Sequence, residues 1–563
     1  MPTTTRSKNY DVIVVGAGAT GAGTARDCAM RGLKVLLVER YDFAAGATGR
    51  NHGLLHSGAR YAVTDHESAT ECISENKILR KIARHCVEDT GGLFITLPED
   101  SLEYQKTFIE ACNNAGIEAR EIDPEQARRM EPAVNSKLIG AVTVPDGAID
   151  PFRLTTANVV DAHRHGADIL TYHEVVGLVK HGTRVEGVVL RDRRTDSEIT
   201  VEAPLVINAG GIWSQRICNM ADVRVNMFPA KGALLIFGHR INNVVINRCR
   251  KPADADILVP GDTISLIGTT SSRIPFEEVE RMDVTREEVD ILLREGVKIA
   301  PCLAYTRILR AYAGVRPLIA SDDDPSGRSI SRGIVCLDHA KRDGLEGFVT
   351  ISGGKLMTYR LMAEIATNMA YEKLGITDPG CTTATTPLPG SNLEEVKPLE
   401  HKAKQHVIAL STVQKAALGR HGSLGIEIDQ AGGGDDAIVC ECEHVSAGEI
   451  KYAINKLHAE SLVHLRRRTR LGMGTCQGCL CACRAAAILG KETHDNTAAI
   501  EDLKMFINER WKGMMAVAWG KTLVEAQFMS WVYAGIGGLS GNVTGGEDCF
   551  STREKMKIET DEI

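Results

Sequence analysis

The sequence lacks the features of a membrane-spanning or exported chain. It contains no run of about 18 or more apolar residues, the length that a transmembrane helix needs. The N-terminus, MPTTTRSKNY, has no charged head followed by an apolar stretch and a cleavage site, as a secretory signal would. We therefore expect a cytoplasmic location.

An excess of positive charge is also missing. The formal net charge is −7 and the sequence pI is near 6.2, so nucleic acid is not an expected partner. With 43% apolar and 25% charged residues over 563 positions, the composition is that of a globular protein. A chain of this length divides into roughly two to four domains.

Closely spaced cysteines are absent from most of the chain. Ten of the 16 cysteines occur singly, and we expect them to be buried thiols in a reducing compartment, where disulfides are rare. The other six fall within 44 positions or so and are the ones that call for a chemical explanation. They are Cys440, Cys442, Cys476, Cys479, Cys481 and Cys483.

The first forty residues carry a dinucleotide-binding pattern. Apolar runs at 10–15 and 35–38 flank a glycine motif and an Ala-rich helical stretch, which gives the order strand, helix, strand. Such glycines permit a tight turn, close approach of a pyrophosphate and close packing of helix on strand. Glu39 ends the second strand, where it is placed to accept hydrogen bonds from a ribose hydroxyl. The motif glycines are Gly16, Gly18 and Gly21.

Two later segments repeat the sequence of strand and glycine turn. They lie at 203–214 and 347–364, and the second continues into a helix. A helix N-terminus carries partial positive charge and stabilises negative charge on a reduced flavin ring. Nucleotide-binding pieces spread over several hundred residues are typical of FAD proteins with an interrupted sheet. The pattern therefore favours FAD over NAD.

Four longer motifs resemble the FAD-dependent glycerol-3-phosphate dehydrogenases. They occupy 39–61, 258–272, 311–318 and 352–360, and the match runs from about residue 8 to about 385. The cysteine-bearing extension beyond is similar to that of the anaerobic branch of this family. The resemblance implies oxidation of sn-glycerol 3-phosphate to dihydroxyacetone phosphate, with electrons passed to a quinone through partner subunits.

The resemblance also implies a fold and a set of site residues. The fold is α/β and α+β: a Rossmann-like FAD-binding domain of the D-amino-acid oxidase type with an inserted substrate domain, plus a small helical [2Fe-2S] domain. The implied substrate residues are His56, Arg60, Tyr61, Arg316 and Lys355. The implied FAD contacts are Gly16, Gly18, Gly21, Glu39, Thr48, Gly210 and Gly354.

These roles agree with the chemistry of a phosphorylated polyol. A phosphate dianion requires cations, and the hydroxyl that is oxidised requires a proton acceptor. The aerobic branch carries a histidine after Lys-Gly-Ser, whereas this chain reads Lys231-Gly232-Ala233. His56 is therefore the candidate acceptor. Arg273 is equally consistent with a substrate contact and with an ordinary surface role.

Composition and motifs together divide the chain into four parts. We expect the FAD-dependent oxidoreductase domain at 1–385, with substrate binding mainly at 225–300. A linker with a helix follows at 386–436, because Pro, Gly and acidic residues gather there. The [2Fe-2S] domain should occupy 437–490. The last segment, 491–563, is expected to pack on the body or to contact a partner.

The six clustered cysteines could form disulfides, a zinc site or an iron–sulfur cluster, and the sequence does not favour these equally. Disulfides are disfavoured in a reducing compartment, and C-x-C is tighter than the usual zinc knuckle. C-x-C followed by C-x2-C or C-x4-C resembles the bacterioferritin-associated ferredoxin-like [2Fe-2S] domain. An iron–sulfur cluster needs four thiolates, and a flavoprotein that exports single electrons has a use for one. The sequence therefore favours a [2Fe-2S] cluster.

The fourth ligand beside Cys440, Cys442 and Cys476 is open between two cysteines. On a helix, a spacing of three residues puts Cys476 and Cys479 on one face. The resemblance to C-Q-G-x-x-C instead selects Cys481, and a non-helical turn at the intervening glycine would allow it. We expect Cys481 to be the ligand and keep Cys479 as the alternative.

The remaining expectations concern partner subunits, the arginine run at 466–470 and the alternative functions. The resemblance implies two partner subunits, one a second flavoprotein and the other a membrane-bound iron–sulfur protein, and hence peripheral attachment to the inner face of the membrane. Arginines at 466–470 form either a solvated helix end or a cationic strip for the cluster or an acidic partner. An amine or amino-acid oxidase of the same fold is the alternative function, and an electron-transfer module without catalysis is a third.

Overall fold

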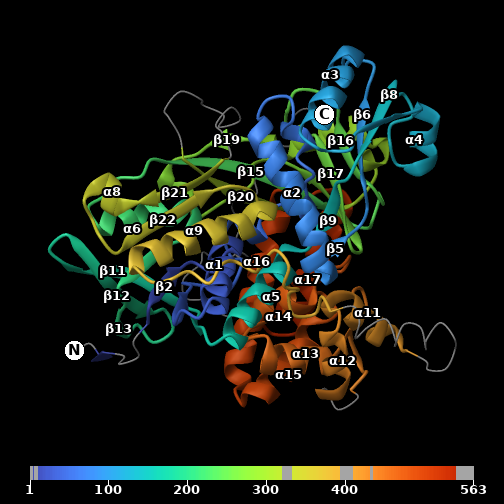
Figure 1. The fold of residues 1–563 in the computed structure, drawn as a ribbon. Coiled ribbons are helices and arrows are strands. Elements are labelled where there is room, and N and C mark those ends of the chain that lie inside the picture. The colour runs from blue at the N-terminus through green and yellow to red at the C-terminus, as the bar shows by residue number, and fades with distance from the viewer. Residues whose placement is uncertain (1–3, 6–9, 320–332, 393–409, 432–434, 540–563) are drawn as a thin grey trace.

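The protein is described by a computed structural model covering residues 4–5, 10–319, 333–392, 410–431 and 435–539. Parts of the predicted linker, at 393–409 and 432–434, and of the predicted last segment, at 540–563, lie outside these residues. Figure 1 shows three regions: a nucleotide-binding module, a large antiparallel sheet and a C-terminal module of helices. We call residues 410–539 the C-terminal module.

A six-stranded sheet forms the centre of the nucleotide-binding module. Its strands β2, β3 and β14 are buried on both faces, which accounts for their nearly continuous runs of Val, Ile and Leu. Five of the strands are parallel and the sixth, β21, is antiparallel to β22. In order across the sheet they are β10 (Asp168–Leu170), β3 (Val35–Val38), β2 (Val12–Val15), β14 (Leu205–Asn208), β22 (Phe348–Gly353) and β21 (Ile334–Asp338).

Two layers cover this sheet, and alternate residues of one strand serve them. Val12 and Val14 pack with three helices, whereas Ile13 and Val15 pack with a second, four-stranded sheet. Pro151 and the Asp150 cap fix the start of α5. The helices are α1 (Ala19–Met30), α5 (Pro151–Arg164) and α9 (Tyr359–Leu374), and the sheet is β1 (Thr4–Thr5), β13 (Glu198–Glu202), β12 (Arg184–Asp192) and β11 (His173–His181).

A nine-stranded sheet forms the second region and holds most of the predicted substrate segment. Three of its strands, β6, β7 and β8, come from 92–144, so the sheet also uses chain outside 225–300. The long strand β20 pairs with β15 along almost its whole length. The strands are β19 (Ser272–Arg273), β15 (Met227–Phe237), β18 (Ile264–Gly268), β17 (Ile257–Gly261), β16 (Val245–Arg248), β6 (Gly92–Thr96), β8 (Gly140–Val144), β7 (Arg120–Ile122) and β20 (Ile308–Ile319).

Helices with regular caps surround these sheets. Thr285 caps α7, and Glu288 returns a hydrogen bond to the cap backbone, which completes a capping box. A three-stranded sheet, β4 (Leu54–Leu55), β9 (Gly147–Ile149) and β5 (Val87–Glu88), links the two regions. The remaining helices are α2 (His66–Ile82), α3 (Leu102–Asn114), α4 (Pro124–Met130), α6 (Ser214–Met220), α7 (Arg286–Ile299) and α8 (His339–Asp343).

The C-terminal module is helical around a short hairpin. Its helices share one apolar core, which includes Cys440 and Cys481. Ser446 accepts a hydrogen bond from the Glu449 N–H, but the Glu449 carboxylate pairs with Arg420 and His421, so a capping box between Ser446 and Glu449 is only half formed. The elements are α11 (Thr412–His421), α12 (Leu424–Ala431), β23 (Ile438–Cys440), β24 (Val445–Ser446), α13 (Ala447–Lys456), α14 (Leu462–Thr469), α15 (Ala482–Thr493), α16 (Asn496–Met515), α17 (Gly520–Ser530) and the π-helical turn η8 (Trp531–Ile536).

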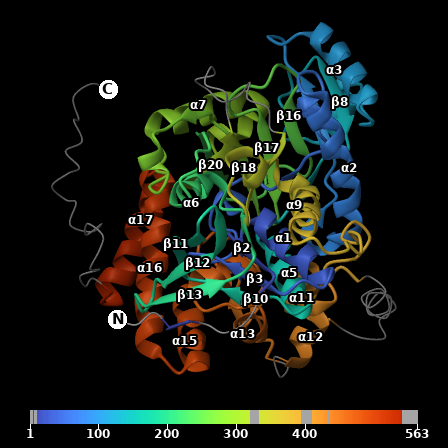
Figure 2. The same cartoon turned by 60° about the vertical axis from the view of Figure 1, so that its left-hand side comes forward.

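Helices α16 and α17 run along the flank of the body as far as α7 (Figure 2). Lys512 of α16 donates to the Arg281 carbonyl, and Val517 belongs to the apolar core beneath the nine-stranded sheet. These residues of the last segment therefore pack against the body. Within the described residues, no helix is both long and apolar enough to cross a membrane.

Candidate functional site

The glycine motif forms the tight turn that the sequence predicts. Gly16 has φ +103°, and a Cβ there would lie 2.7 Å from the Ala209 carbonyl oxygen. A Cβ on Gly21 would lie 1.8 Å from the Gly16 carbonyl oxygen. Neither position accepts a side chain, because the turn, α1 and the neighbouring strand approach one another at backbone distance. Gly18 is the residue before α1, whose N-terminus it exposes.

Glu39 and Thr48 flank this turn. The Glu39 carboxylate accepts hydrogen bonds from the Ala17 N–H at 2.8 Å and the Tyr41 N–H at 3.0 Å, and burial raises its pKa. The Thr48 hydroxyl accepts from the Ala19 N–H at 3.0 Å, at the first turn of α1. An acid at the end of β3 and a hydroxyl at the helix N-terminus lie where a ribose and a pyrophosphate are bound in this motif.

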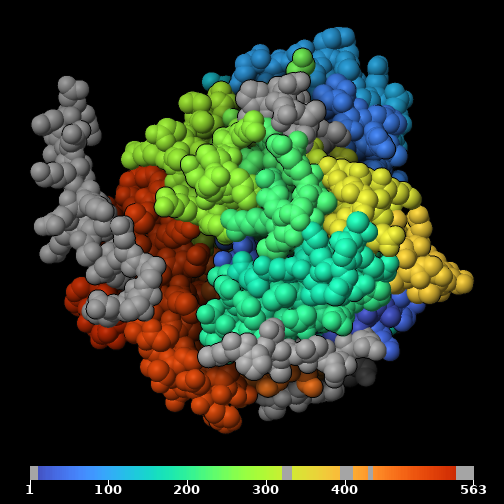
Figure 3. All heavy atoms as spheres, turned by 90° about the vertical axis from the view of Figure 1, so that its left-hand side faces the viewer, coloured from blue at the N-terminus to red at the C-terminus, as the bar shows by residue number. Residues whose placement is uncertain are grey.

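A cavity of about 1520 Å³ opens at the turn. Gly16, Gly18, Glu39, Thr48 and Gly210 line it, and its opposite wall comes from α14 and α16 of the C-terminal module. In Figure 3, blue N-terminal residues lie in a hollow between the red C-terminal helices and the green middle of the chain. Because small-molecule sites commonly enclose about 300–1,000 Å³, the cavity has room for a whole dinucleotide.

The lining residues fit FAD. A Cβ on Gly18 would lie 3.1 Å from the Thr48 hydroxyl oxygen and would fill the cradle at the start of α1. The five predicted contacts named above surround one continuous space, as an extended dinucleotide requires. Gly21 supports the turn from behind. Gly354 has φ +67° and lies apart from the cavity lining, beside Met362 of α9.

Three of the predicted substrate residues lie together. The His56 and Tyr61 rings are 5.6 Å apart between centroids, and the Lys355 ammonium lies 5.0 Å from the centre of the Tyr61 ring. His56 is buried, and its carbonyl accepts a hydrogen bond from Asn76 at 3.0 Å. None of the three lines the cavity described above, so they form a neighbouring group beside it.

The other two, Arg60 and Arg316, converge on one end of the β17–β18 hairpin. Arg60 donates to the Asp256 carboxylate at 2.9 Å, just before β17. Arg316 donates to the Thr269 hydroxyl at 2.5 Å, just after β18. The Ala255 N–H bonds to the Thr269 carbonyl at 3.2 Å and joins the two sides. Although burial opposes ionisation of Asp256, Arg60 and Arg250 lower its pKa.

Arg273 does not join this group. Its side chain is exposed and lies over the Phe228 ring at 4.7 Å. This is the ordinary surface role that the sequence left open for it.

Four of the six clustered cysteines lie side by side. A hydrogen bond from the Cys481 thiol lowers the pKa of Cys440, and one from the Cys442 thiol lowers that of Cys476. The pKa of Cys481 is raised because its thiol donates to Cys440 and also to Cys476. The structure thus groups the four cysteines that the sequence analysis selected as ligands.

Cys479 is directed elsewhere. Burial raises its pKa, and the charged group facing it is Arg510 of α16. Tyr533 donates to its backbone carbonyl at 2.7 Å. Residues 475–481 form turns rather than a helix, and Gly478 has φ +93°, so the helical-face argument for Cys479 does not apply to this loop.

The grouping provides the ligands that a two-iron core needs. A [2Fe-2S] cluster is held by four cysteine thiolates. Cys440, Cys442, Cys476 and Cys481 supply four thiols that contact one another. The four cysteines therefore fit that group.

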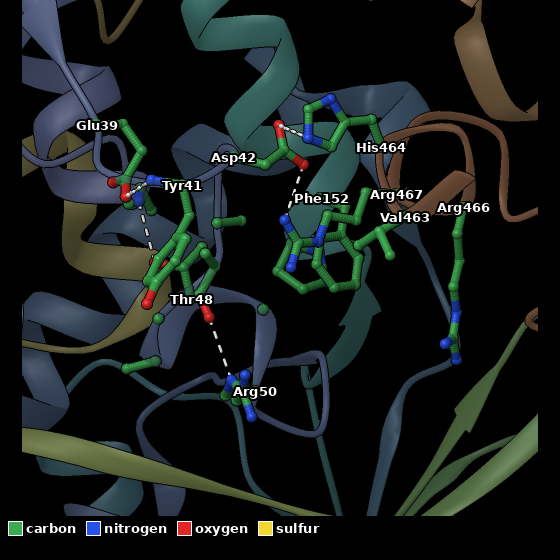
Figure 4. Close-up of a pocket in the computed structure, with 18 of the residues that line it drawn as sticks. Glu39, Tyr41, Asp42, Thr48, Arg50, Phe152, Val463, His464, Arg466 and Arg467 are labelled. Atoms are coloured by element: carbon green, nitrogen blue, oxygen red, sulfur yellow. Dashed lines mark hydrogen bonds and ion pairs between the residues drawn. The ribbon is translucent and has the colours of Figure 1, made fainter. Parts of the chain in front are cut away.

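The arginine run of α14 is neither solvated nor directed at a partner. Arg468 and Arg467 pair with Asp42 of the nucleotide-binding module at 2.5 and 2.8 Å. Arg470 pairs with Glu443 and with Asp262, each at 3.0 Å. Two of the uses expected for this run, a solvated helix end and an acidic partner surface, are thus wrong for these three side chains. The other use, a cationic strip beside the cluster, stays a prediction. Figure 4 shows Asp42 between Arg467 and His464.

Two residues on or next to β20 contact the other parts of the site, and the sequence gives no indication of either contact. Arg307 at the start of β20 donates to the Thr475 carbonyl at 2.7 Å, beside the cysteine loop, and pairs with Glu525. Tyr312 of the same strand donates to the Asn51 carbonyl at 2.8 Å, in the loop behind Thr48. Strand β20 thereby contacts the cysteine loop, the nucleotide loop and, at Arg316, the substrate group.

Comparison with known proteins gives the family. Residues 11–360 match the family of FAD dependent oxidoreductases, and residues 438–490 match the BFD-like [2Fe-2S] binding domain. The chain is 62% identical over 534 residues to the A subunit of the anaerobic glycerol-3-phosphate dehydrogenase of Escherichia coli (strain K12), covering 95% of this chain and 98% of that protein. The chain belongs to this family of anaerobic glycerol-3-phosphate dehydrogenase subunits.

More distant members share the same architecture. The A1 subunit of the anaerobic glycerol-3-phosphate dehydrogenase of Haloferax volcanii is 41% identical over 546 residues, covering 94% of this chain and 90% of that protein. The crystal structure of the Bacillus halodurans glycerol-3-phosphate dehydrogenase complexed with FAD superposes with a TM-score of 0.65 at 22% identity, covering 89% of this chain and 94% of that one. The predicted fold class is thus confirmed, and FAD and [2Fe-2S] are the cofactors of its two matched domains.

Proposed function

We propose that the protein oxidises sn-glycerol 3-phosphate to dihydroxyacetone phosphate and passes the electrons towards a quinone. The observation that carries this function is the 62% identity to a component of an anaerobic glycerol-3-phosphate dehydrogenase over nearly the whole length of both chains. The fold, the nucleotide turn and the four grouped cysteines provide what such a reaction requires.

The substrate group is suited to a phosphate dianion. Arg60 and Arg316 bring two cations to one end of the β17–β18 hairpin, and Lys355 lies over the ring of Tyr61, the residue next to Arg60. Guanidinium groups bind phosphate oxygens in pairs. Hydrogen bonds to Thr269 and Asp256 hold the two arginines in one orientation. Fixed cations lose little freedom on binding, which favours a small, highly charged substrate.

His56 is our candidate for the proton acceptor. It is buried beside Tyr61, whose ring also contacts the Lys355 ammonium. The Asn76 amide fixes the backbone at His56 through three carbonyl oxygens, those of Leu55, His56 and Pro145. A proton acceptor must keep its position relative to the hydroxyl that it deprotonates, and this anchoring supplies it.

Glu39, Thr48 and the glycine turn would hold FAD, and Cys440, Cys442, Cys476 and Cys481 would hold the [2Fe-2S] cluster. When bound, FAD accepts a hydride and the cluster carries single electrons. The interface of α14 and β20 fixes the relative positions of the two sites. Arg307, which contacts Thr475 next to Cys476, directly precedes β20, the strand that carries Arg316.

Two partner subunits complete the proposal: one is a second flavoprotein, and the other is a membrane-bound iron–sulfur protein that attaches the complex to the inner face of the membrane. Exposed apolar side chains near the cysteine loop support this. Leu480 is 57% exposed and Trp531 66% exposed, and Tyr533 of η8 bonds to the Gly478 and Cys479 carbonyls. Large exposed apolar side chains in one area are typical of protein contacts.

Replacement of Trp531 by Glu tests the partner contact. We expect loss of electron delivery to quinone in membranes with unchanged oxidation of glycerol 3-phosphate by a soluble dye. The matched control is Ile376→Glu, because Ile376 is 49% exposed at the end of α9, away from the cysteine loop. Equal quinone reduction by both variants would contradict a contact at Trp531.

The alternative function, an amine or amino-acid oxidase, is supported by the shared fold alone. One experiment separates the two. The purified protein is mixed anaerobically with sn-glycerol 3-phosphate or with a panel of amino acids, and visible and EPR spectra are recorded. We expect flavin bleaching and an S = 1/2 signal with glycerol 3-phosphate only. Bleaching by an amino acid, with none by glycerol 3-phosphate, would establish the alternative.

A further inference from the structure

Three partly buried arginines from three separate segments line the cavity between the modules. Arg50 follows Thr48 in the nucleotide loop, Arg310 lies on β20, and Arg466 lies on α14 of the C-terminal module. In Figure 4 the Arg466 side chain extends away from Asp42, in contrast to its neighbour Arg467. The three lie on two modules, so the group exists only where the modules meet.

Tyr312 shows how closely these side chains gather. Residues 310, 312 and 314 share one face of β20, because side chains alternate along a strand. A Cβ on Gly314 would lie 2.9 Å from the Arg50 Cβ, which places Arg50 against this face. Burial raises the pKa of Tyr312, and the three charges that oppose this are those of Arg310, Arg466 and Arg50.

None of the three has an ion-pair partner among the residues that the structure describes, whereas the arginines beside Arg466 are paired. The Nε and Nη1 atoms of Arg310 are inaccessible to solvent and have no hydrogen-bond partner. The Arg50 guanidinium donates from Nε to the Ala45 carbonyl at 3.1 Å. Donors of this kind are costly to bury unless an acceptor reaches them.

The charges around the group leave a positive excess. Arg510 and Arg467 add to it, and the facing carboxylate is that of Glu509, which is itself exposed. Burial lowers the pKa of Arg466, and repulsion by Arg310 and Arg510 lowers it further. Since a guanidinium stays protonated in proteins, such a group is stable only with an anion beside it.

We propose that Arg50, Arg310 and Arg466 form a phosphate-binding site shared by the nucleotide-binding and C-terminal modules. Phosphate is the anion that suits it, because three planar guanidinium forks match its tetrahedral set of oxygens and its charge. The phosphate comes either from the diphosphate of the resident dinucleotide or from a free phosphate. The site lies outside the group of Arg60, Arg316 and Lys355, so it is separate from the proposed substrate site.

Arg466→Gln is the informative variant, because Arg466 belongs to the module that lacks the glycine turn. Thermal unfolding of the full-length, FAD-loaded protein is followed against inorganic phosphate at constant ionic strength, with chloride as the balancing anion. FAD release on dilution is followed by flavin fluorescence in the same samples. The matched control is Arg191→Gln, an exposed arginine paired with Glu198.

Either of two results supports the site. If a free phosphate occupies it, phosphate stabilises the wild-type protein, and the midpoint concentration rises about tenfold or more in Arg466→Gln. If the diphosphate of FAD occupies it, phosphate has no specific effect, and Arg466→Gln releases FAD at about tenfold higher protein concentration. Arg191→Gln behaves as wild type in both. Wild-type behaviour of Arg466→Gln in both measurements overturns the proposal.

A second variant tests the same proposal if Arg466→Gln folds poorly. Arg466→Met fills the same space without a charge, so it removes the repulsion from Arg310 and Arg510. We expect it to unfold at a higher temperature than wild type in phosphate-free buffer after FAD removal, and to show the same loss of phosphate response or FAD retention. A purely structural role for Arg466 predicts a lower unfolding temperature and an unchanged response, which would also overturn the proposal.

Discussion

The Arg468 guanidinium lies 2.5 Å from the Asp42 carboxylate, across 426 positions of sequence. Asp42 follows Glu39 by three residues, so the loop that leaves the ribose-binding end of β3 is also the loop on which α14 rests. Both side chains are almost inaccessible to solvent. The contact therefore ties the position of the C-terminal module to the nucleotide loop itself.

Asp42→Asn should destabilise the protein strongly. The change leaves Arg467 and Arg468 buried without a countercharge, and breaking a buried pair in this way costs about 3–5 kcal/mol. The measurement is the thermal-unfolding midpoint, together with limited proteolysis at the junction before α14. Asp222→Asn removes the exposed partner of Lys180 and should change stability by less than about 1 kcal/mol. A similar small effect of both changes would contradict a structural role for Asp42.

Stability should decline as pH rises through the titration of Asp502. Burial raises the pKa of this carboxyl to about 6, although the Leu462 N–H donates to it. Its charged form is disfavoured in the folded state, so the group costs nothing below its unfolded pKa near 4. Between pH 4 and pH 6 to 7 the cost grows to about 3 kcal/mol.

Asp502→Asn keeps an oxygen for the Leu462 N–H and removes the charge. We expect it to raise the unfolding temperature at pH 8 and to leave it nearly unchanged at pH 4. Thermal unfolding at the two pH values provides the measurement, with Asp495→Asn, the cap of α16, as a neighbouring aspartate control. An equal shift at both pH values would show that the carboxyl is not titrating there.

Cys481→Ser should abolish the cluster, whereas Cys479→Ser should retain it. The reason is that Cys481 contacts the Cys440 and Cys476 thiols, while Cys479 faces Arg510. Iron content of the anaerobically purified protein and the S = 1/2 EPR signal after reduction distinguish the two variants. Cys483→Ser serves as the control, because Cys483 is an exposed cysteine in the first turn of α15. Loss of iron in Cys479→Ser with retention in Cys481→Ser would reverse the assignment.

Arg316→Gln should reduce kcat/KM for glycerol 3-phosphate by about 10- to 100-fold. A charge-assisted hydrogen bond contributes about 1.5–3 kcal/mol, and the amide retains polarity but no charge. The dye-coupled assay gives the ratio, and Arg273→Gln is the control, since Arg273 is exposed over Phe228. If the two variants lose activity equally, the substrate phosphate is not held by Arg316.

The sequence predicts the local elements of this fold well, because their signals are local. The apolar run at 35–38 becomes β3 with the same bounds. The glycine turn follows for the same reason, since only glycine accepts the backbone approach at Gly16. The nine-stranded sheet does not follow as easily, because β6 pairs with β16 about 150 residues later and neither strand encodes its partner.

The candidate site likewise has features that the sequence predicts and features that it does not. Grouping of Cys440 with Cys481 is accessible from motif spacing, and a helical reading of the loop was misleading because Gly478 adopts a left-handed turn. The ion-pair partners of the arginines at 466–470 could not be predicted from the sequence. A run of like charges at a helix end indicates exposure in most proteins, and here the compensating acids, Asp42 and Asp262, lie in segments hundreds of residues away.

The pairing of β20 with β15 has a mechanical consequence. Eleven residue pairs join the two strands from Met227 to Phe237, so neither strand slides without breaking the whole ladder. Since Arg307 contacts the cysteine loop at one end of β20 and Arg316 belongs to the substrate group near the other, the strand acts as a spacer of fixed length. The separation between the proposed substrate residues and the loop that carries Cys476 is thus set by the length of one paired strand.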